Sequence, residues 1–199
     1  MVKTTKGEQS KIKLIECAAE LFLQKGYNGT GINDILAGTR LPKGSFYFHF
    51  SSKKDLAINV SEYFEKKIGG WILKTSKEKK WTEFITDLIG EMIKGAENKE
   101  HFGCPFAVLG LEIAFSESDI SEHYYKSMKK LIDIFASVFE FSGVPKDKID
   151  ILSNRAFALY EGYLLYYRIG KDIDILRMMS RDLIEIYENF MELKELKSK

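Results

Sequence analysis

Apolar residues recur every three to four positions along most of the chain, and no long stretch alternates between apolar and polar residues. This spacing predicts an all-helical protein, because a helix repeats every 3.6 residues whereas a strand repeats every two. Glycine, proline and aspartate between the apolar segments indicate where helices begin and end. The predicted helices span about 8–25, 32–38, 43–50, 53–74, 81–96, 104–115, 121–141, 146–169 and 172–196.

The segment 30–56 is unusual because it contains two short helices joined by a tight turn. The Thr30 hydroxyl is expected to cap the first of these helices. Leu41 in the turn is expected to be buried, and Pro42 to lie in the first turn of the second helix, where its missing N–H does no harm. The pattern therefore predicts a helix-turn-helix.

The second short helix has one apolar face and one polar face. Phe46 and Phe50, four residues apart, are expected to point inward. The residues left on the outside are Lys43, Gly44, Ser45, Tyr47, Phe48 and His49. Their polar groups can donate hydrogen bonds to phosphate oxygens or base edges, and glycine allows a close backbone approach. We therefore expect this face to bind DNA.

Lys53 extends the same expectation to the next helix. It follows a Ser51-Ser52 cap, and a basic side chain at a helix N-terminus opposes the helix dipole. A nearby phosphate would explain its presence.

These residues resemble the N-terminal domain of TetR/AcrR-type transcriptional regulators. The matching positions are Gly26, Tyr27, Thr30, Asp34, Ile35, Lys43, Gly44, Ser45, Phe46, Tyr47, His49, Phe50, Ser52 and Lys53. The resemblance implies a homodimeric bacterial regulator whose N-terminal three-helix helix-turn-helix domain, residues 1–52, binds a palindromic double-stranded DNA operator. Residues 53–199 would then form a helical domain that binds a small-molecule inducer and dimerises, and the helix over about 53–74 would link the two.

The resemblance also assigns roles by position. It implies base contacts from Lys43, Gly44 and Asn33. The phosphate contacts that it implies are those of Ser45, Tyr47, His49 and Lys53. The full predicted DNA-binding set is Thr30, Asn33, Lys43, Gly44, Ser45, Tyr47, Phe48, His49 and Lys53. The chain departs from the family pattern at Thr39-Arg40, where Ala-Gly is usual, and at Pro42, where Ser is usual. The Pro-Lys-Gly-Ser sequence starting at Pro42 resembles that of one branch of the family.

Charge is distributed as this division predicts. Residues 1–60 contain nine basic and five acidic residues, a net charge of +4, and the remainder must carry −3 because the whole chain carries +1. A basic DNA-binding domain joined to a domain that does not bind DNA has a charge asymmetry of this sign.

The helix over about 146–169 is too apolar for an ordinary surface helix. Its bulky apolar residues cover more than one face: Phe157, Leu159, Tyr160, Tyr163, Leu164, Tyr166 and Tyr167. In a two-fold dimer, the last two helices of each subunit would bury the second face in a four-helix interface. The alternative is that all these residues serve one intrachain core.

The C-terminal part also contains aromatic residues that suit the wall of a ligand site. The candidates are Trp71, Phe84, Leu88, Met92, Cys104, Phe106, Tyr160, Tyr163 and Tyr167. Aromatic residues at helical spacing more often form plain core, so we expect only a few of these to contact a ligand. The ligand class that they indicate is a small apolar or aromatic molecule.

Cys104 allows a second hypothesis. It lies between Gly103 and Pro105 at a predicted helix N-terminus, which stabilises a thiolate. The Gly103-Cys104-Pro105 sequence resembles the helix start in one branch of the TetR family, and some members of that branch sense electrophiles or oxidants through cysteine. The chain could therefore be a redox or electrophile sensor that acts through Cys104, whereas the simpler interpretation is a small buried side chain.

Catalytic, cofactor and metal sites are not indicated. The sequence lacks a nucleophile elbow, a zinc-protease motif, a phosphate-binding loop and a dinucleotide fingerprint, so we expect no enzyme and no cofactor. His101 and Cys104 have ligand-like spacing, but no second pair completes a metal site. No apolar run of 18 residues and no signal peptide is present, so we expect a soluble cytoplasmic protein that does not enter a membrane.

Overall fold

The computed structural model describes residues 5–98 and 103–197, with the side chains of 193–197 left out. Every regular element in these ranges is helical, so the predicted all-α fold class is confirmed. The described helices include none that has both the length and the apolarity needed to cross a membrane.

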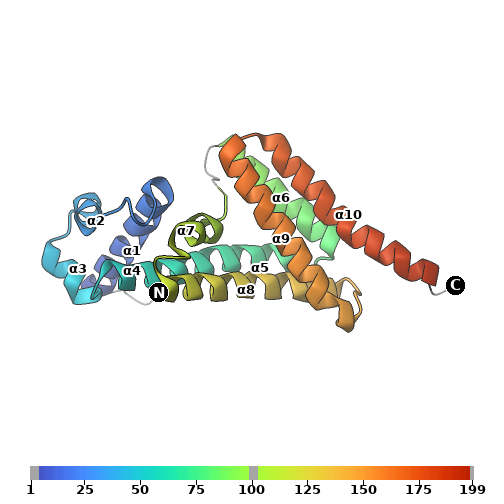
Figure 1. Ribbon diagram of the computed structural model, residues 1–199, viewed down its shortest axis with the longest axis horizontal. Coiled ribbons are helices and arrows are strands. Elements are labelled where there is room, and N and C mark those ends of the chain that lie inside the picture. Colours follow the sequence, from blue (N-terminus) through green and yellow to red (C-terminus); the bar gives the residue numbers. More distant parts are fainter. Residues whose placement is uncertain (1–4, 99–102, 198–199) are drawn as a thin grey trace. The chain divides into compact units, whose positions relative to one another are not determined.

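The first three helices form the predicted helix-turn-helix. They are α1 (Lys6–Lys25), α2 (Ile32–Thr39) and α3 (Lys43–His49), and Figure 1 shows α2 and α3 joined by a tight turn with α1 beside them. Thr5 caps α1 in a reciprocal arrangement with Glu8, whose carboxylate accepts the Thr5 backbone N–H at 2.6 Å. These hydrogen bonds hold the pKa of Glu8 below its ordinary value.

The predicted helix over 53–74 contains an irregularity. It consists of α4 (Lys53–Phe64), a π-helical segment η1 (Glu65–Gly69) and α5 (Gly70–Ser76). As predicted, a serine caps its start, because the Ser52 hydroxyl accepts the N–H of Asp55 at 3.1 Å. A π-helical turn widens the hydrogen-bond ladder by one residue and shifts the faces of the helix that follow it.

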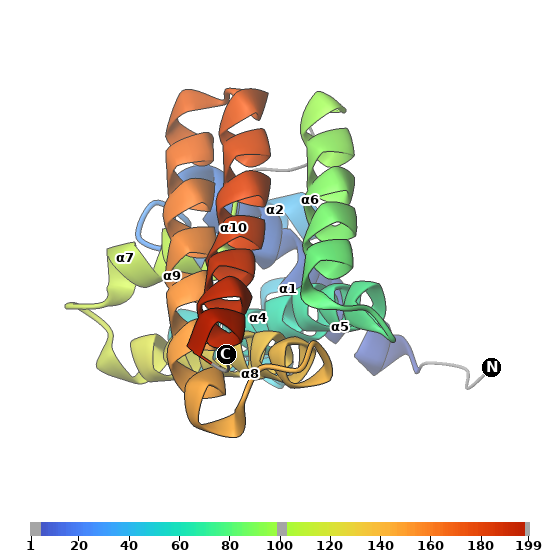
Figure 2. The same ribbon diagram turned by 90° about the vertical axis from the view of Figure 1, so that its right-hand side faces the viewer.

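The remaining helices match their predicted spans within three residues at each end. They are α6 (Trp81–Glu97), α7 (Pro105–Ile113), α8 (Ser118–Phe141), α9 (Lys146–Gly170) and α10 (Ile173–Lys197). Figure 2 shows α6, α9 and α10 side by side, and α10 packs against both of the others.

The chain divides into two compact units that are discontinuous in sequence. We call residues up to 68 together with 105–127 the head unit, and residues 69–104 together with 128 onward the body unit. The head unit therefore contains α7 and the first part of α8 in addition to the helix-turn-helix. The functional division at residue 52 stays a prediction.

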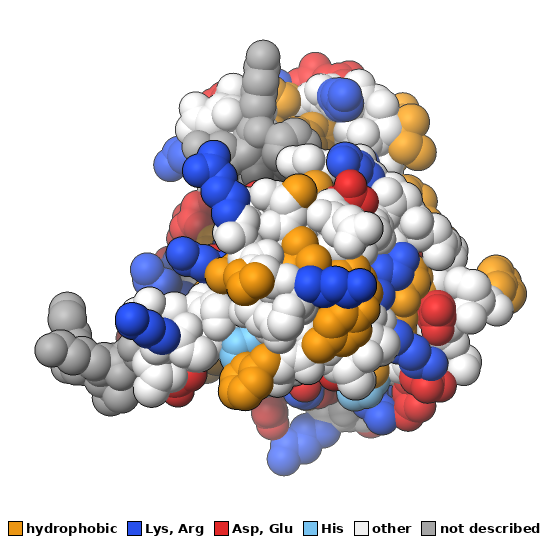
Figure 3. Space-filling view, turned by 90° about the vertical axis from the view of Figure 1, so that its left-hand side faces the viewer, with side chains coloured by type: hydrophobic (Ala, Val, Ile, Leu, Met, Phe, Trp, Pro, Cys, Tyr) orange, Lys and Arg blue, Asp and Glu red, His pale blue; other side chains and the backbone are white. Residues whose placement is uncertain are grey.

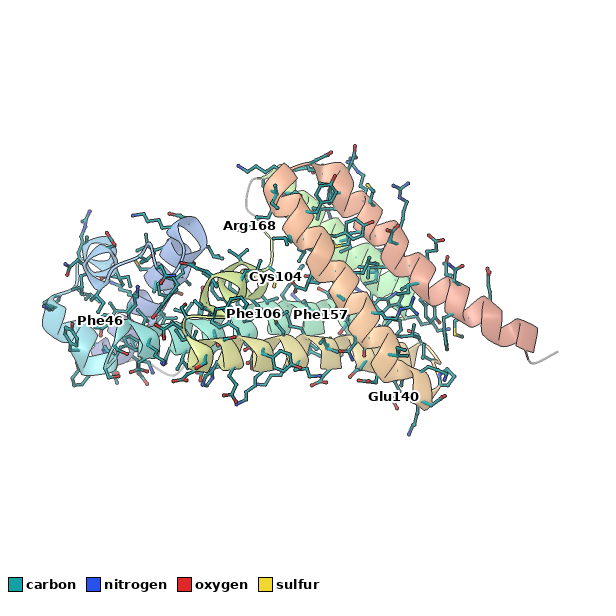
Figure 4. The ribbon with its side chains drawn as sticks, in the orientation of Figure 1. Phe46, Cys104, Phe106, Glu140, Phe157 and Arg168 are labelled. Carbon is teal, nitrogen blue, oxygen red and sulfur yellow. The ribbon has the colours of Figure 1, made fainter. Side chains whose placement is uncertain are left out.

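The core of the head unit is built from apolar residues of the helix-turn-helix and α4. Leu14, Ile35, Phe46 and Leu56 are completely buried. Phe46 points into this interior from α3, as Figure 4 shows. The predicted inward orientation of Phe46 and Phe50 is confirmed, whereas Leu41 is only half-buried.

The core of the body unit is centred on Trp81. Its indole N–H donates to the carbonyl oxygen of Leu183 at 2.6 Å, and its backbone N–H donates to the Ser142 hydroxyl at 2.8 Å. The indole stacks on Phe139 with ring centres 3.8 Å apart. These contacts fix α6, α8 and α10 to one another, because a buried indole must satisfy its N–H.

Candidate functional site

Helix α3 combines a buried anchor with an exposed polar face. Phe46 and Phe50 are 0% and 1% exposed, and their rings are 5.7 Å apart. On the opposite face Tyr47 is 51% exposed and Phe48 is 80% exposed. The helix is therefore held by its apolar side and presents the other side to a partner.

Lys43 and Gly44 extend this exposed face to the start of the helix. Both are exposed, and the Lys43 ammonium lies 5.8 Å from the centre of the Tyr47 ring. A Cβ added to Gly44 would meet no atom within 4 Å, so the backbone there is open to a close approach. Figure 3 shows basic and hydrophobic side chains intermingled on the face at this end of the chain. Asn33 on α2 is also exposed.

His49 and Ser45 are half-buried. The Nε2 atom of His49 lies 2.9 Å from the Ser10 hydroxyl of α1. This contact braces α3 against α1 and fixes the imidazole ring at the edge of the exposed face.

Thr30 is a correction. It is completely buried, and its hydroxyl donates to the carbonyl oxygens of Gly26 at 2.8 Å and Leu21 at 3.3 Å. Gly31 occupies the cap position of α2 instead, and its N–H donates to the Asp34 carboxylate at 2.7 Å. The predicted cap at Thr30 is wrong because its hydroxyl points back to Leu21 and Gly26 and Gly31 takes the cap position. Its side chain is also not presented to DNA.

Lys53 has structural partners that the sequence pattern did not indicate. Its ammonium donates to the carbonyl oxygens of Tyr27 at 3.0 Å and Thr30 at 3.1 Å, and lies 4.3 Å from the centre of the Tyr27 ring. A lysine has three N–H donors, so one is left for a phosphate. That phosphate contact stays a prediction, but it no longer explains by itself why a lysine begins α4.

Glu112 of α7 is a residue that sequence analysis missed. Its carboxylate accepts the backbone N–H groups of Tyr27 at 2.8 Å and Asn28 at 2.7 Å, just after α1. Gly26 has a φ of +79°, and a Cβ there would lie 2.6 Å from Glu112 Oε2. The only sequence signal was a single acid in an otherwise apolar helix.

Replacing Glu112 by glutamine is expected to lower the free energy of unfolding by about 1–3 kcal/mol, because the glutamine oxygen can accept from only one of the two amides and the charge is removed. Amide hydrogen exchange at Tyr27 and Asn28 should accelerate selectively. Asp119→Asn, which removes an exposed ion pair with Lys54, is the control and should cost less than about 1 kcal/mol. Unchanged exchange at both amides in Glu112→Gln would contradict this role.

Most of the predicted ligand-wall residues are in the body unit and are buried. Phe84 and Leu88 are completely buried, and Met92, Tyr160 and Tyr167 are at most 6% exposed. Phe106 is in the head unit, where its ring packs edge-on against Phe64 and Tyr124.

Two of the candidates have polar partners on neighbouring helices. The Trp71 indole donates to Glu91, and the Tyr163 hydroxyl donates to Asp182, which raises the pKa of Tyr163. These hydrogen bonds engage the indole N–H of Trp71 and the hydroxyl of Tyr163 within the protein.

Cys104 lies beside α9, as Figure 4 shows, and is 6% exposed. The preceding Gly103 has a φ of +94°, and a Cβ on it would lie 3.2 Å from the Leu164 carbonyl oxygen. Burial raises the pKa of Glu161 to about 7. The nearby Cys104 thiol acts in the opposite direction and lowers the pKa of Glu161. His101, the other half of the ligand-like spacing, lies outside the described residues.

Comparison with known proteins identifies the family. A model of bacterial regulatory proteins of the tetR family matches residues 14–60, which contain the helix-turn-helix. A second model, of the C-terminal domain of LmrA/YxaF-like transcriptional regulators, matches residues 82–182, half of the chain. The chain belongs to the TetR family of bacterial transcriptional regulators.

Individual TetR-family relatives agree with this assignment. The chain is similar to the HTH-type transcriptional regulator LmrA of Bacillus subtilis, with 26% identity over 82% of this chain and 88% of LmrA. It is also 26% identical to an HTH-type regulator from the lacX 3′ region of Lactococcus lactis, over 84% of this chain and 87% of the relative. A TetR-family regulator from Cytophaga hutchinsonii shares the fold, with a TM-score of 0.82, 19% identity, and coverage of 94% and 97% of the two chains.

Membership of the TetR family settles the broad class of the protein. The relatives are transcriptional regulators, so the chain is a DNA-binding helix-turn-helix regulator and not an enzyme.

The departures from the TetR pattern have a visible geometry. Arg40 ends α2 with a φ of +56°, in the left-handed conformation. Glycine adopts this conformation most easily, and glycine is the usual residue at this position in the family. Pro42 precedes the first residue of α3, where its missing N–H breaks no hydrogen bond. Neither departure disturbs the exposed face of α3.

The cysteine-sensor alternative gains no support from this comparison or from the geometry. A reactive cysteine needs an accessible thiolate in an electropositive setting. Cys104 is buried beside a carboxyl group instead.

Proposed function

We propose that this TetR-family protein is a cytoplasmic homodimeric repressor. It binds a palindromic operator through α3 and releases it when a small apolar or aromatic inducer binds the body unit. The observation that carries the proposal is the exposed face of α3, where Tyr47 and Phe48 remain outside while Phe46 anchors the helix.

The chemistry of this face supports DNA as the partner. Lys43 can reach a guanine edge or a phosphate, and Tyr47 and His49 can hydrogen-bond phosphate oxygens. Phe48 is an exposed aromatic side chain on this face. Its ring offers apolar contact to sugars or thymine methyl groups. Ser45 and Asn33 complete the proposed contact set with Gly44 and Lys53.

An exposed stripe on α9 supports dimerisation. Ile151, Ala158 and Leu165 are seven residues apart, and Gly162 and Ile169 form a second series with the same period. All five are exposed, with Ile169 at 76%. Apolar and small residues at heptad spacing suit close packing against a second helix. Phe157, Tyr160, Leu164 and Tyr167 belong to the intrachain core, so this stripe replaces them in the proposed interface.

The Leu165→Glu substitution is expected to convert the dimer to a monomer at micromolar concentration, because it places a charge in the centre of the stripe. Sedimentation velocity measures the change, and Leu73→Glu is the matched control because Leu73 is an exposed leucine on α5. A dimer of unchanged stability in Leu165→Glu would exclude α9 from the interface.

The path of the chain suggests how a ligand in the body unit could act on the head unit. Cys104 of the body unit is followed directly by Pro105, the first residue of α7. The same helix carries Glu112, which holds the backbone of Tyr27 and Asn28 after α1. A shift of Cys104 would therefore be passed to the helix-turn-helix through one short helix.

A titration of the purified protein with labelled duplex DNA from the region beside its own gene tests the proposal. Six or more phosphate contacts predict that affinity falls about 1,000-fold between roughly 50 and 200 mM salt. Unlabelled operator should compete far better than unrelated DNA. Equal competition by both would reject sequence-specific regulation through this DNA.

A further inference from the structure

The turn of the helix-turn-helix carries a charged residue in a conformation that favours glycine. Arg40 ends α2 with a φ of +56° and a ψ of +27°, and its side chain is exposed. In this left-handed conformation the Cβ of an L-residue crowds the backbone, whereas glycine adopts it freely. The shape of the turn alone would therefore be served better by glycine, and a strained residue of this kind points to a role for its side chain.

The protein itself provides no partner for this side chain. In the described part of the chain, the Arg40 guanidinium has neither a hydrogen bond nor an ion pair. Positions 35–54 contain four basic residues and no acid, and the flanking Asp34 and Asp55 each accept a nearby backbone N–H. Because a guanidinium has five N–H donors in a planar fork, all of them are available to an acidic partner from outside.

The turn lies close to the proposed DNA-binding face. Arg40 is three residues before Lys43, the first residue of α3. Three residues of chain span at most about 11 Å, and the major groove of DNA is about 12 Å wide. When the first residues of a recognition helix meet base edges, a long side chain this close to them reaches the phosphates that border the groove. Figure 3 shows several basic side chains on the face at this end of the chain.

We propose that Arg40 binds an operator phosphate at the edge of the groove that α3 enters, in addition to the contact set given above. This inference rests on the proposed function, because it requires α3 to enter an operator. Arginine and phosphate pair through two parallel N–H donors. A phosphate contact fixes the position of the protein on the duplex without selecting a base, so Arg40 adds affinity and not sequence preference.

The second departure from the TetR pattern in this turn supports the assignment. Pro42 precedes α3 where serine is usual, and its ring has neither a hydroxyl nor an N–H to donate. Arg40 is the nearest residue before Pro42 whose side chain carries donors. The guanidinium thus gives the turn a donor for phosphate that the proline has removed.

Lys171 shows what Arg40 would do if its role were only structural. It ends α9 in the body unit with a φ of +54°, and it is also exposed. A cation at a helix C-terminus interacts favourably with the helix dipole, and this effect applies to both residues. A purely structural Arg40 would therefore behave like Lys171 when it is replaced, with an effect on stability and none on operator affinity.

The Arg40→Gly substitution in the full-length protein tests the proposal through two properties that should change in opposite directions. Relief of the left-handed conformation should raise the melting temperature by about 2 °C or more. Affinity for the labelled duplex from beside the gene, measured by fluorescence anisotropy, should fall at least about tenfold, because each subunit loses a charged contact. The logarithm of affinity should also depend less steeply on the logarithm of salt concentration, with a slope smaller by about two, since each lost phosphate contact contributes about 0.9.

Two further variants separate charge from backbone strain. Lys171→Gly is the matched control, because it relieves the same conformation at the end of α9. It should gain similar thermal stability and keep its operator affinity within about twofold. Arg40→Lys keeps the charge but loses the paired donors, so it should retain most of the salt dependence and lose less affinity than Arg40→Gly.

The outcomes distinguish this inference from the proposed function. Specific operator binding by the wild type, with unchanged affinity and salt dependence in Arg40→Gly, would overturn the phosphate contact and leave the regulator in place. An affinity loss that varies with the base pairs of the operator would also overturn it, because a phosphate contact is lost equally on every sequence. A folded, dimeric wild type that does not distinguish the operator from unrelated DNA would reject the proposed function and this assignment with it.

Discussion

The double substitution Lys43→Ala, Tyr47→Ala is expected to lower operator affinity about 100-fold or more without unfolding the protein, because each side chain contributes on the order of 1–3 kcal/mol to a DNA contact. Both residues are exposed on α3, and neither belongs to the core that anchors the helix. Fluorescence anisotropy with the operator duplex measures the loss. Far-ultraviolet circular dichroism and the melting temperature should stay close to those of the wild type.

Tyr125→Ala is the control for this experiment. Tyr125 is 59% exposed on α8, comparable with Tyr47, but it lies outside the proposed DNA-binding face. Its replacement should change operator affinity less than about threefold. Equal losses in the two variants would mean that the proposed α3 face does not hold DNA.

Glu161 is expected to make the wild type less stable as pH rises from 5 to 8. Its folded-state pKa of about 7 lies above the ordinary value of 4.5, so between these values the folded protein keeps a proton that the unfolded chain has released. Stability contributed by that proton is present at low pH, falls through this window and is absent above it. The raised pKa corresponds to a loss of about 3 kcal/mol.

Urea unfolding at fixed protein concentration, at pH 5 and pH 8, measures this effect. The Glu161→Gln variant should lose less stability than the wild type over the same range, and the difference between the two should approach about 3 kcal/mol. Glu140→Gln should follow the wild type, because its carboxyl group is exposed. Parallel pH dependence in all three proteins would show that the Glu161 carboxyl is not held in a desolvated site.

Local patterns predicted the fold well because the relevant signals lie close together in the sequence. Phe46 and Phe50 are four residues apart, and their shared inward orientation follows from helical spacing alone. Gly103 and Pro105 mark the start of α7, Gly143 and Pro145 separate α8 from α9, and Gly170 and Asp172 separate α9 from α10. The π-helical segment Glu65–Gly69 lies between α4 and α5, and the Gly69-Gly70 pair at its end is a local signal that the prediction of one continuous helix did not use.

The candidate sites were predicted less completely because their contacts join distant residues. Thr30 was expected to cap the helix after it, but its hydroxyl turns back to the carbonyl oxygens of Leu21 in α1 and of Gly26 just after α1. The Glu112 contact with Tyr27 joins residues 85 positions apart, and no local pattern specifies it. Glu161 is one of three acids on α9, with Asp147 and Asp150, and only the helices that surround it decide that its carboxylate oxygens are buried.

Selection of DNA from a random-sequence pool by the purified dimer tests the central claim most directly. The account predicts enrichment of an inverted repeat with two equal half-sites, because two α3 helices related by two-fold symmetry read the same sequence in opposite directions. The Lys43→Ala, Tyr47→Ala variant should enrich no sequence. Failure of the folded wild-type dimer to enrich any sequence, or enrichment of the same repeat by that variant, would contradict the account.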